Sequence, residues 1–104
     1  MAELLTTEAI TEAAMTLLPS ARLWARRSSS SKLDEDLTET VAACLAELQE
    51  AGVACSVEDY LIRQAVKFCV KSHFGPAEDS DRWGKAYDRL KDTLSLSPRY
   101  RIGG

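Results

Sequence analysis

The sequence contains no long apolar run. No stretch approaches the ~20 residues that a helix needs to cross a membrane, and the first residues lack the basic-then-apolar pattern of a secretory signal. Cysteine is scarce: Cys44, Cys55 and Cys69 form an odd set without close spacing, which argues against a disulfide framework and favours a reducing compartment. We therefore expect a cytosolic protein without a membrane partner.

Groups that catalyse reactions are equally rare. The chain has one histidine, His73, and its five glycines are scattered, so no glycine-rich phosphate or oxyanion loop is present. Cys69 and His73 have the i, i+4 spacing of two zinc ligands on one helix face, but a structural site needs two more, and only Cys44 and Cys55 remain. Because cysteines also pack as small apolar side chains, we favour a core role for them. The sequence predicts no enzyme, no metal site and no cofactor.

The chain is short. Its 104 residues can hold one core, so 1–104 is predicted to be a single domain. Hydrophobic residues make up 45% and charged residues 28%, which is typical of a soluble globular protein. A domain of this length hides only roughly 60–65% of the surface that its unfolded chain exposes, and self-association would add burial.

Charge is distributed in blocks around a net value of −3. Residues 1–20 carry only acids, residues 22–32 only bases, and residues 33–59 only acids. The bases of the middle block are Arg22, Arg26, Arg27 and Lys32, with Trp24 among them. Such a block is the one patch that resembles a site for nucleic acid or an acidic partner. The alternative, which we favour, is a solvated loop whose arginines pair with the acids that follow.

The apolar spacing predicts four helices. Thr7 can cap a first helix over residues 7–18, which should stop where Pro19 disfavours helical geometry in the residue before it. Residues 19–32 include four serines in a row and are expected to form an exposed, mobile loop. Residues 33–94 are expected to hold the three core helices.

The later helices have clear boundary signals. Acids at 34–36 favour a helix start through the helix dipole, and Gly52 is well placed after the last turn of that helix. Ser56 is expected to open the third helix and Gly75, with the proline after it, to end it. The fourth helix should end near Leu94. Because no alternating strand pattern occurs, we predict an all-α, compact bundle of about four helices with an extended C-terminal segment.

The third predicted helix is apolar around most of its circumference. A helix of this kind is packed on more than one side, so we take it as the central helix, in contact with its siblings and with a neighbouring subunit. The candidate contacts between subunits are Trp24, Arg63, Lys67, Lys71 and Phe74.

Residues 95–104 are neither helical in pattern nor polar enough for a plain disordered tail. Apolar and arginine side chains alternate there, and aromatic and arginine side chains are typical interface anchors. The candidate partner-binding residues are Leu96, Arg99, Tyr100, Arg101 and Ile102. Whether the segment contacts a partner or folds back over the core is left open by the sequence.

A run of motifs in the second half resembles a known family. It comprises Leu61-Ile62-Arg63-Gln64-Ala65-Val66, Phe74-Gly75, Trp83, Tyr87, Leu90-Lys91, Leu94-Ser95 and Tyr100-Arg101. Together with the acidic start of the second helix, these motifs resemble the head–tail connector (adaptor) proteins of tailed bacteriophages over roughly residues 33–101. The matching positions are packing patterns and include no catalytic signature.

The resemblance implies a structural protein of the virion, made in the cytoplasm of a host bacterium. Such proteins form a ring, commonly a dodecamer, beneath the portal protein, and a stopper or tail-completion protein docks on that ring. DNA passes through the lumen without sequence-specific binding. A head-to-tail contact repeated around an axis closes into such a ring. The residues expected to face the channel, where negative charge would repel DNA and let it slide, are Asp34, Glu35, Asp36 and Glu39.

Two alternatives remain open. A small cytosolic helical regulator or adaptor could bind nucleic acid or an acidic partner through the basic residues 22–32. A completion protein at another level of the same phage assembly would have the same helical content as a connector.

Overall fold

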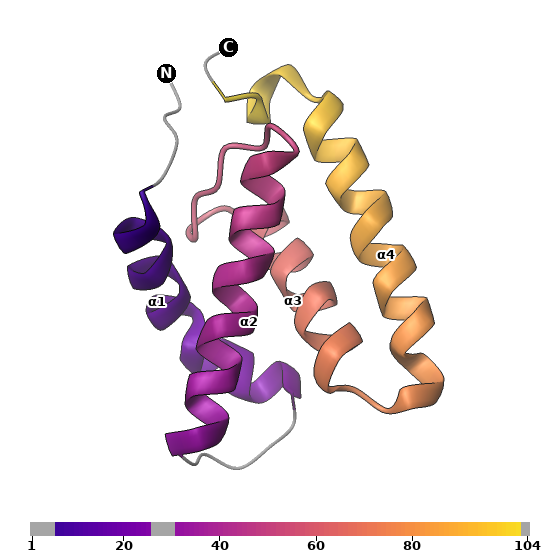
Figure 1. The fold of residues 1–104 in the computed structure, drawn as a ribbon. Helices are drawn as coiled ribbons and strands as arrows, with labels where there is room; N and C mark the ends of the chain where they lie inside the picture. The colour runs from indigo at the N-terminus through magenta and orange to yellow at the C-terminus, as the bar shows by residue number, and fades with distance from the viewer. Residues whose placement is uncertain (1–5, 26–30, 103–104) are drawn as a thin grey trace.

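The chain folds into four helices that run alternately down and up the molecule (Figure 1). The structure, a computed structural model, describes residues 6–25 and 31–102. The helices are α1 (Thr7–Ala25), α2 (Ser31–Glu50), α3 (Tyr60–Phe74) and α4 (Ala77–Leu96), followed by a single 3-10 turn, η1 (Pro98–Tyr100). No strand occurs within these ranges, although Val53 and Arg101 form an isolated antiparallel bridge. The predicted all-α bundle of four helices is confirmed.

One continuous apolar core holds the helices together. α1 packs chiefly on α2 and α4 on α3, while α3 also packs against α1 and α2. The predicted packing of the third helix on more than one side is therefore confirmed. The largest fully buried side chains are Leu17, Leu37, Leu45, Leu48, Ile62 and Leu94.

The first helix is longer than the sequence predicted. α1 continues through Pro19 to Ala25, so the predicted end at residue 18 is wrong, and so is the predicted loop over residues 19–25. Pro19 removes one backbone donor, but it is exposed, while Leu17, Ala21 and Ala25 continue a buried stripe along the helix. Burial of that stripe outweighs the lost hydrogen bond. Residues 26–30, which include both arginines and three of the four serines, lie outside the described residues. Ser31 and Lys32 belong to α2, so the predicted loop is wrong at that end as well.

The residues that cap the starts of α1 and α3 also differ from expectation. Thr6, not Thr7, caps α1, because its hydroxyl accepts the N–H of Ala9 at 3.1 Å. Asp59, not Ser56, caps α3, with its carboxylate accepting the N–H groups of Leu61 at 2.8 Å and Ile62 at 3.3 Å. The sequence offers several residues with a side-chain oxygen before each helix. Which of them is the cap depends on the residue at which the preceding turn ends and the helical backbone begins.

The predicted signals at the ends of α2 and α3 are confirmed. Gly52 follows α2 with a φ of +89°, a left-handed conformation that glycine adopts without steric cost. The Val53 N–H then donates to the Leu48 carbonyl at 3.0 Å, which satisfies an end group of the helix. α3 ends at Phe74, directly before Gly75.

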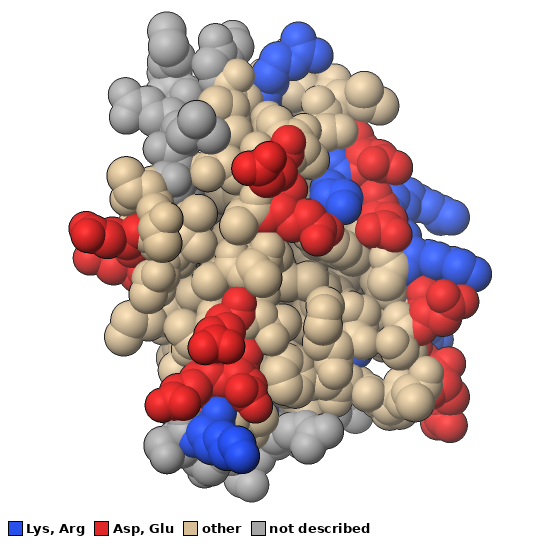
Figure 2. Space-filling model, viewed as in Figure 1, with Lys and Arg blue, Asp and Glu red and all other residues tan. Residues whose placement is uncertain are grey.

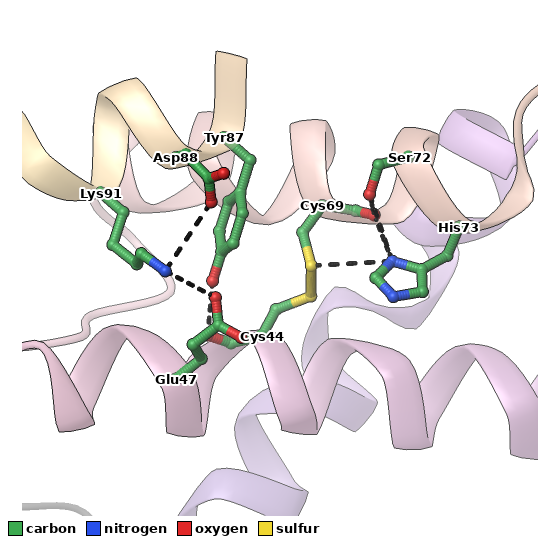
Figure 3. The surroundings of a disulfide bond; sticks show 8 residues. All are labelled: Cys44, Glu47, Cys69, Ser72, His73, Tyr87, Asp88 and Lys91. Carbon is green, nitrogen blue, oxygen red and sulfur yellow. Dashed lines mark hydrogen bonds and ion pairs between the residues drawn. A yellow bond between two sulfur atoms is a disulfide. The ribbon is translucent and has the colours of Figure 1, made fainter. Parts of the chain in front are cut away.

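A disulfide between Cys44 and Cys69 joins α2 to α3 (Figure 3). The expectation of no disulfide is therefore wrong. The two cysteines are 25 positions apart in the sequence, but α2 and α3 run antiparallel and bring their Cα atoms to 6.5 Å. A cross-link closing a loop of this length stabilises a fold by roughly 3 kcal/mol. Cys55 keeps its thiol, and burial raises the pKa of that thiol to about 11.

Candidate partner-binding cleft

An open cleft lies where the end of α1, the end of α3 and the start of α4 meet. It encloses about 550 Å³, and its walls carry both tryptophans of the chain. The lining residues are Trp24, Ala25, Lys71, Phe74, Gly75, Pro76, Asp79, Arg82 and Trp83. We call this hollow the aromatic cleft. Its position follows from the local sequence, because Gly75 and Pro76 turn the chain from α3 into α4 and leave a gap beside the last turn of α1.

Trp83 is the centre of the cleft's chemistry. Its ring stacks on Phe68, with centroids 5.6 Å apart and an angle of 27° between the planes. The Lys71 ammonium and the Arg82 guanidinium each lie 4.8 Å from the Trp83 ring, where the negative face of the indole attracts cations. Arg82 also pairs with Asp79 at 3.7 Å. The cleft is therefore aromatic inside, with a rim that carries more positive than negative charge.

A row of bases leads along α3 to the cleft. Arg63, Lys67 and Lys71 follow one another at i, i+4 and i+8, on one side of the helix, and α3 contains no acid. We call these three residues the basic stripe. The guanidinium of Arg63 donates to the hydroxyl of Ser20 on α1 at 3.0 Å, which fixes the start of the stripe against α1.

The predicted contacts between subunits divide into two sets. The structure brings Trp24, Lys71 and Phe74 together as walls of the cleft, and it places Arg63 and Lys67 on the stripe that reaches it. Arg82 and Trp83 were not predicted as site residues from the sequence, and Trp83 was named only as one of the motifs that carry the resemblance. The signal that could have found them is the pairing of the chain's second tryptophan with a neighbouring arginine.

The predicted channel-facing acids are not equivalent. Asp34 is half-buried and accepts two hydrogen bonds from the Arg22 guanidinium, at 2.9 and 2.7 Å. Glu35, Asp36 and Glu39 are exposed, and we call these three residues the acidic face of α2. Figure 2 shows acidic side chains near both ends of α2 with uncharged surface between them, whereas acidic and basic side chains lie together over α4. A single chain does not place these acids relative to a channel.

The Arg22–Asp34 bond also bears on the basic block. We favoured a loop whose arginines pair with acids of the second helix, and Arg22 does so from α1 rather than from a loop. Lys32 lies exposed in the first turn of α2. Arg26 and Arg27 lie outside the described residues.

The C-terminal segment folds back over the core at its aromatic residue. Tyr100 is only 8% exposed, and its hydroxyl donates to the Asp59 carboxylate, 3.0 Å from each oxygen. The backbone is held as well, because the Ala54 N–H donates to the Tyr100 carbonyl at 2.6 Å and the Ile102 N–H to the Gly52 carbonyl at 3.0 Å. Tyr100 therefore belongs to the core and is not available to a partner in this fold.

Other candidates of that segment remain on the outside. Leu96 is 76% exposed at the end of α4, which extends two residues beyond the predicted end at Leu94. Arg99 and Arg101 are exposed, and Ile102 is half-buried. The sequence left open whether this segment contacts a partner or folds back over the core. In the structure Tyr100 folds back over the core, whereas Leu96, Arg99 and Arg101 remain accessible to a partner.

A second hollow, of about 230 Å³, lies beside the disulfide and is lined by both of its cysteines. The His73 ring points along α3 towards Cys69, with Nδ1 2.8 Å from the Cys69 carbonyl oxygen and 4.0 Å from its sulfur. Cys69 has no thiol in this state, so the pair offers neither a nucleophile nor a thiolate ligand. Within residues 6–25 and 31–102, no three His, Cys, Asp or Glu side chains gather as a metal site would require.

The remaining polar contacts near the disulfide bind α4 to α2. The Lys91 ammonium lies 2.8 Å from the Glu47 carboxylate and lowers its pKa. The Tyr87 hydroxyl donates to the Cys44 carbonyl at 3.5 Å, and burial raises the pKa of that hydroxyl. These contacts are structural ties between helices.

Comparison with known proteins adds no relative. In the described part of the chain, each helix is too short or too polar to span a bilayer. No protein-family model, no curated protein and no solved structure matches the sequence or the fold. What the chain does is therefore inferred from its own surfaces and from the resemblance of its sequence motifs.

Proposed function

We propose that this chain is the subunit of a ring that joins the head of a tailed bacteriophage to its tail, and that the aromatic cleft is its contact with a neighbouring protein. The observation that supports the proposal is the meeting of Trp24, Lys71 and Phe74 in one open cleft. Trp24 lies far from Lys71 and Phe74 in the sequence, and all three are among the candidate contacts between subunits that were predicted from the sequence.

The cleft has the chemistry of a protein-binding surface. Tryptophan and arginine are enriched among the side chains that carry interface binding energy, and phenylalanine is enriched at interfaces. The cleft is lined by all three. A site for a small molecule is usually more enclosed and buries most of its ligand, whereas this hollow opens widely between helix ends. A protruding side chain from another protein is the better fit.

The opposite end of the molecule is the proposed contact with the portal or with a stopper or tail-completion protein. α4 has 20 residues, so its two ends lie about 30 Å apart. Leu96 is exposed at its C-terminal end and Arg99 and Arg101 are exposed beyond it, while Tyr100 anchors that surface to the core. On this proposal a ring subunit contacts its neighbours and its vertical partner through different ends. DNA in the lumen is then not bound in a sequence-specific way.

Co-expression with the portal protein of the same genome tests the proposal. We expect native mass spectrometry and electron microscopy to find a closed ring of this chain on the portal. The variant Trp24→Ala should lose the ring, whereas Met15→Ala, which truncates an exposed side chain on the same helix, should keep it. Circular dichroism of both variants separates loss of assembly from loss of fold. A wild-type chain that stays monomeric and does not bind the portal would overturn the proposal.

A further inference from the structure

The two central helices carry opposite charge on their solvent sides. α3 displays the basic stripe and has no acid, whereas α2 displays the acidic face and has Lys32 as its single base. Among the described residues, no carboxylate pairs with Lys67, and no Lys or Arg side chain pairs with Glu35 or Glu39. Each surface therefore has charge that no side chain of residues 6–25 and 31–102 neutralises.

Lys67 of the stripe and Glu35 of the acidic face lie on the outer sides of their helices. α2 and α3 meet through Cys44 and Cys69, which are buried and bonded to each other. At 100° per residue, Lys67 lies about 200° around α3 from Cys69, and Glu35 lies about 180° around α2 from Cys44. Lys67 and Glu35 thus face away from the shared contact, whereas Glu39 lies at the edge of the hollow beside the disulfide. In Figure 2, which looks onto α2, the acids are in view.

We propose that the partner on the basic stripe is the acidic face of a second copy of this chain. The inference rests on the proposed ring and adds which surfaces meet in it. Glu35 and Glu39 are four positions apart, as are Arg63 and Lys67, so each pair of charges is spaced by about 6 Å along its helix. Two ion pairs between neighbouring copies can therefore form in register.

The contact is head-to-tail, because each copy offers one surface of each sign. Two different surfaces that meet repeatedly generate a ring or a filament, whereas a two-fold dimer would place like charges on each other. In this arrangement Glu35 and Glu39 lie between copies and not on the channel wall. The aromatic cleft, which shares Lys71 with the stripe, lies at the edge of the same contact.

Charge reversal tests the contact in purified full-length protein. We expect Lys67→Glu and Glu39→Lys each to weaken self-association by about tenfold or more, measured by analytical ultracentrifugation and native mass spectrometry. An equimolar mixture of the two variants should assemble again, because each then presents the charge that the other lacks. The double variant, which reverses both surfaces in one chain, should assemble on its own. Arg89→Glu on α4 is the matched control and should assemble like the wild type, since its exposed charge lies on neither surface.

The outcomes separate this inference from the proposed function. A ring that forms normally with Lys67→Glu, or a mixture that fails to recover, overturns the stripe-to-acid contact but leaves the ring in place. A wild-type chain that never associates, alone or on the portal, overturns the ring itself. If Lys67→Glu abolished binding of duplex DNA and left self-association intact, the stripe would be a nucleic-acid surface and the inference would be wrong.

Discussion

The C-terminal segment and the aromatic cleft have similar composition, but the aromatic side chain of the first is buried and that of the second lines an open hollow. Both combine aromatic side chains with bases, and some residues of each were expected to contact other proteins. In the structure Tyr100 is 8% exposed and bonded to Asp59, while Trp83 lines an open hollow with bases around it. Composition alone therefore does not separate an interface from a core.

What separates them is the presence of a partner on the same chain. Tyr100 lies in a segment whose backbone forms hydrogen bonds with Gly52 and Ala54. These bonds place its hydroxyl beside Asp59, the cap of α3. Trp83 lies on a regular helix next to a turn, and nothing in the described residues covers the hollow that it lines. The substitutions below test this difference, from the largest expected effect to the smallest.

Removing the aromatic ring of Tyr100 in the C-terminal segment should cause the largest loss of stability. We expect Tyr100→Ala to lower the free energy of unfolding by about 3 kcal/mol, because it leaves a cavity where a buried ring packed. Urea unfolding followed by circular dichroism measures the change. Leu96→Ala in the same segment is the control and should change it by less than about 0.5 kcal/mol. Equal effects of the two variants would mean that the segment is not part of the core.

Removing only the Tyr100 hydroxyl gives a smaller and pH-dependent effect. We expect Tyr100→Phe to cost about 1.5 kcal/mol near pH 7, the value of a hydrogen bond to a charged acceptor. Burial, and then the bond to Asp59, raise the pKa of Tyr100 above its usual 10.0. The neutral hydroxyl thus stabilises the fold fully below pH 10 and loses that contribution as the pH rises through the higher folded value. Unfolding at pH 8 to 11 should show a steeper loss in the wild type than in the variant; parallel curves would contradict this.

Substitution of the aromatic side chain in the aromatic cleft should affect the stability of the fold less than substitution of Tyr100. We expect Trp83→Leu to lower the free energy of unfolding by about 1 kcal/mol, since it removes the stack on Phe68 but keeps an apolar side chain. Association should fall by more than the stability loss explains, as sedimentation at matched concentration would show. A stability loss as large as that of Tyr100→Ala would place Trp83 in the core and remove the distinction between the C-terminal segment and the aromatic cleft.

Substitution in the Lys91–Glu47 ion pair, which belongs to neither the C-terminal segment nor the aromatic cleft, should have the smallest effect on stability. The Lys91–Glu47 pair is partly exposed, so Glu47→Gln should cost about 0.5 kcal/mol. Because Lys91 lowers the pKa of Glu47, the pair contributes above the ordinary value of 4.5 and is lost as the pH falls through the lower folded value. Acid unfolding of the wild type and the variant should therefore converge at low pH. A gap that persists there would mean that the side chain acts by packing.

Much of the fold could be predicted from the sequence, because periodicity and end signals are local. The stripe of Leu37, Val41 and Leu48 and the glycine after it define α2 almost completely. The length of α1 could not be read in this way, since Pro19 is a strong local stop signal that burial of Ala21 and Ala25 overrides. Such an override depends on what the other helices offer for packing.

The candidate site could be predicted only in part, and for a related reason. Lys71 and Phe74 follow from the over-apolar third helix, but their meeting with Trp24 and Trp83 depends on how three helix ends converge. The Cys44–Cys69 bond is the clearest case, because a pairing across two antiparallel helices has no signature in the spacing. Local patterns name residues, whereas the tertiary arrangement decides which of them are neighbours.

The disulfide has a mechanical consequence if copies meet through the outer sides of α2 and α3. The cross-link lies on the line between those two sides, so tension applied to one side passes to the other through a covalent bond. Packed side chains alone would let the helices slide under the same pull. In a stretched ring the joints between subunits would then yield before the subunits deform, and the ring could reopen and close without any chain having to refold.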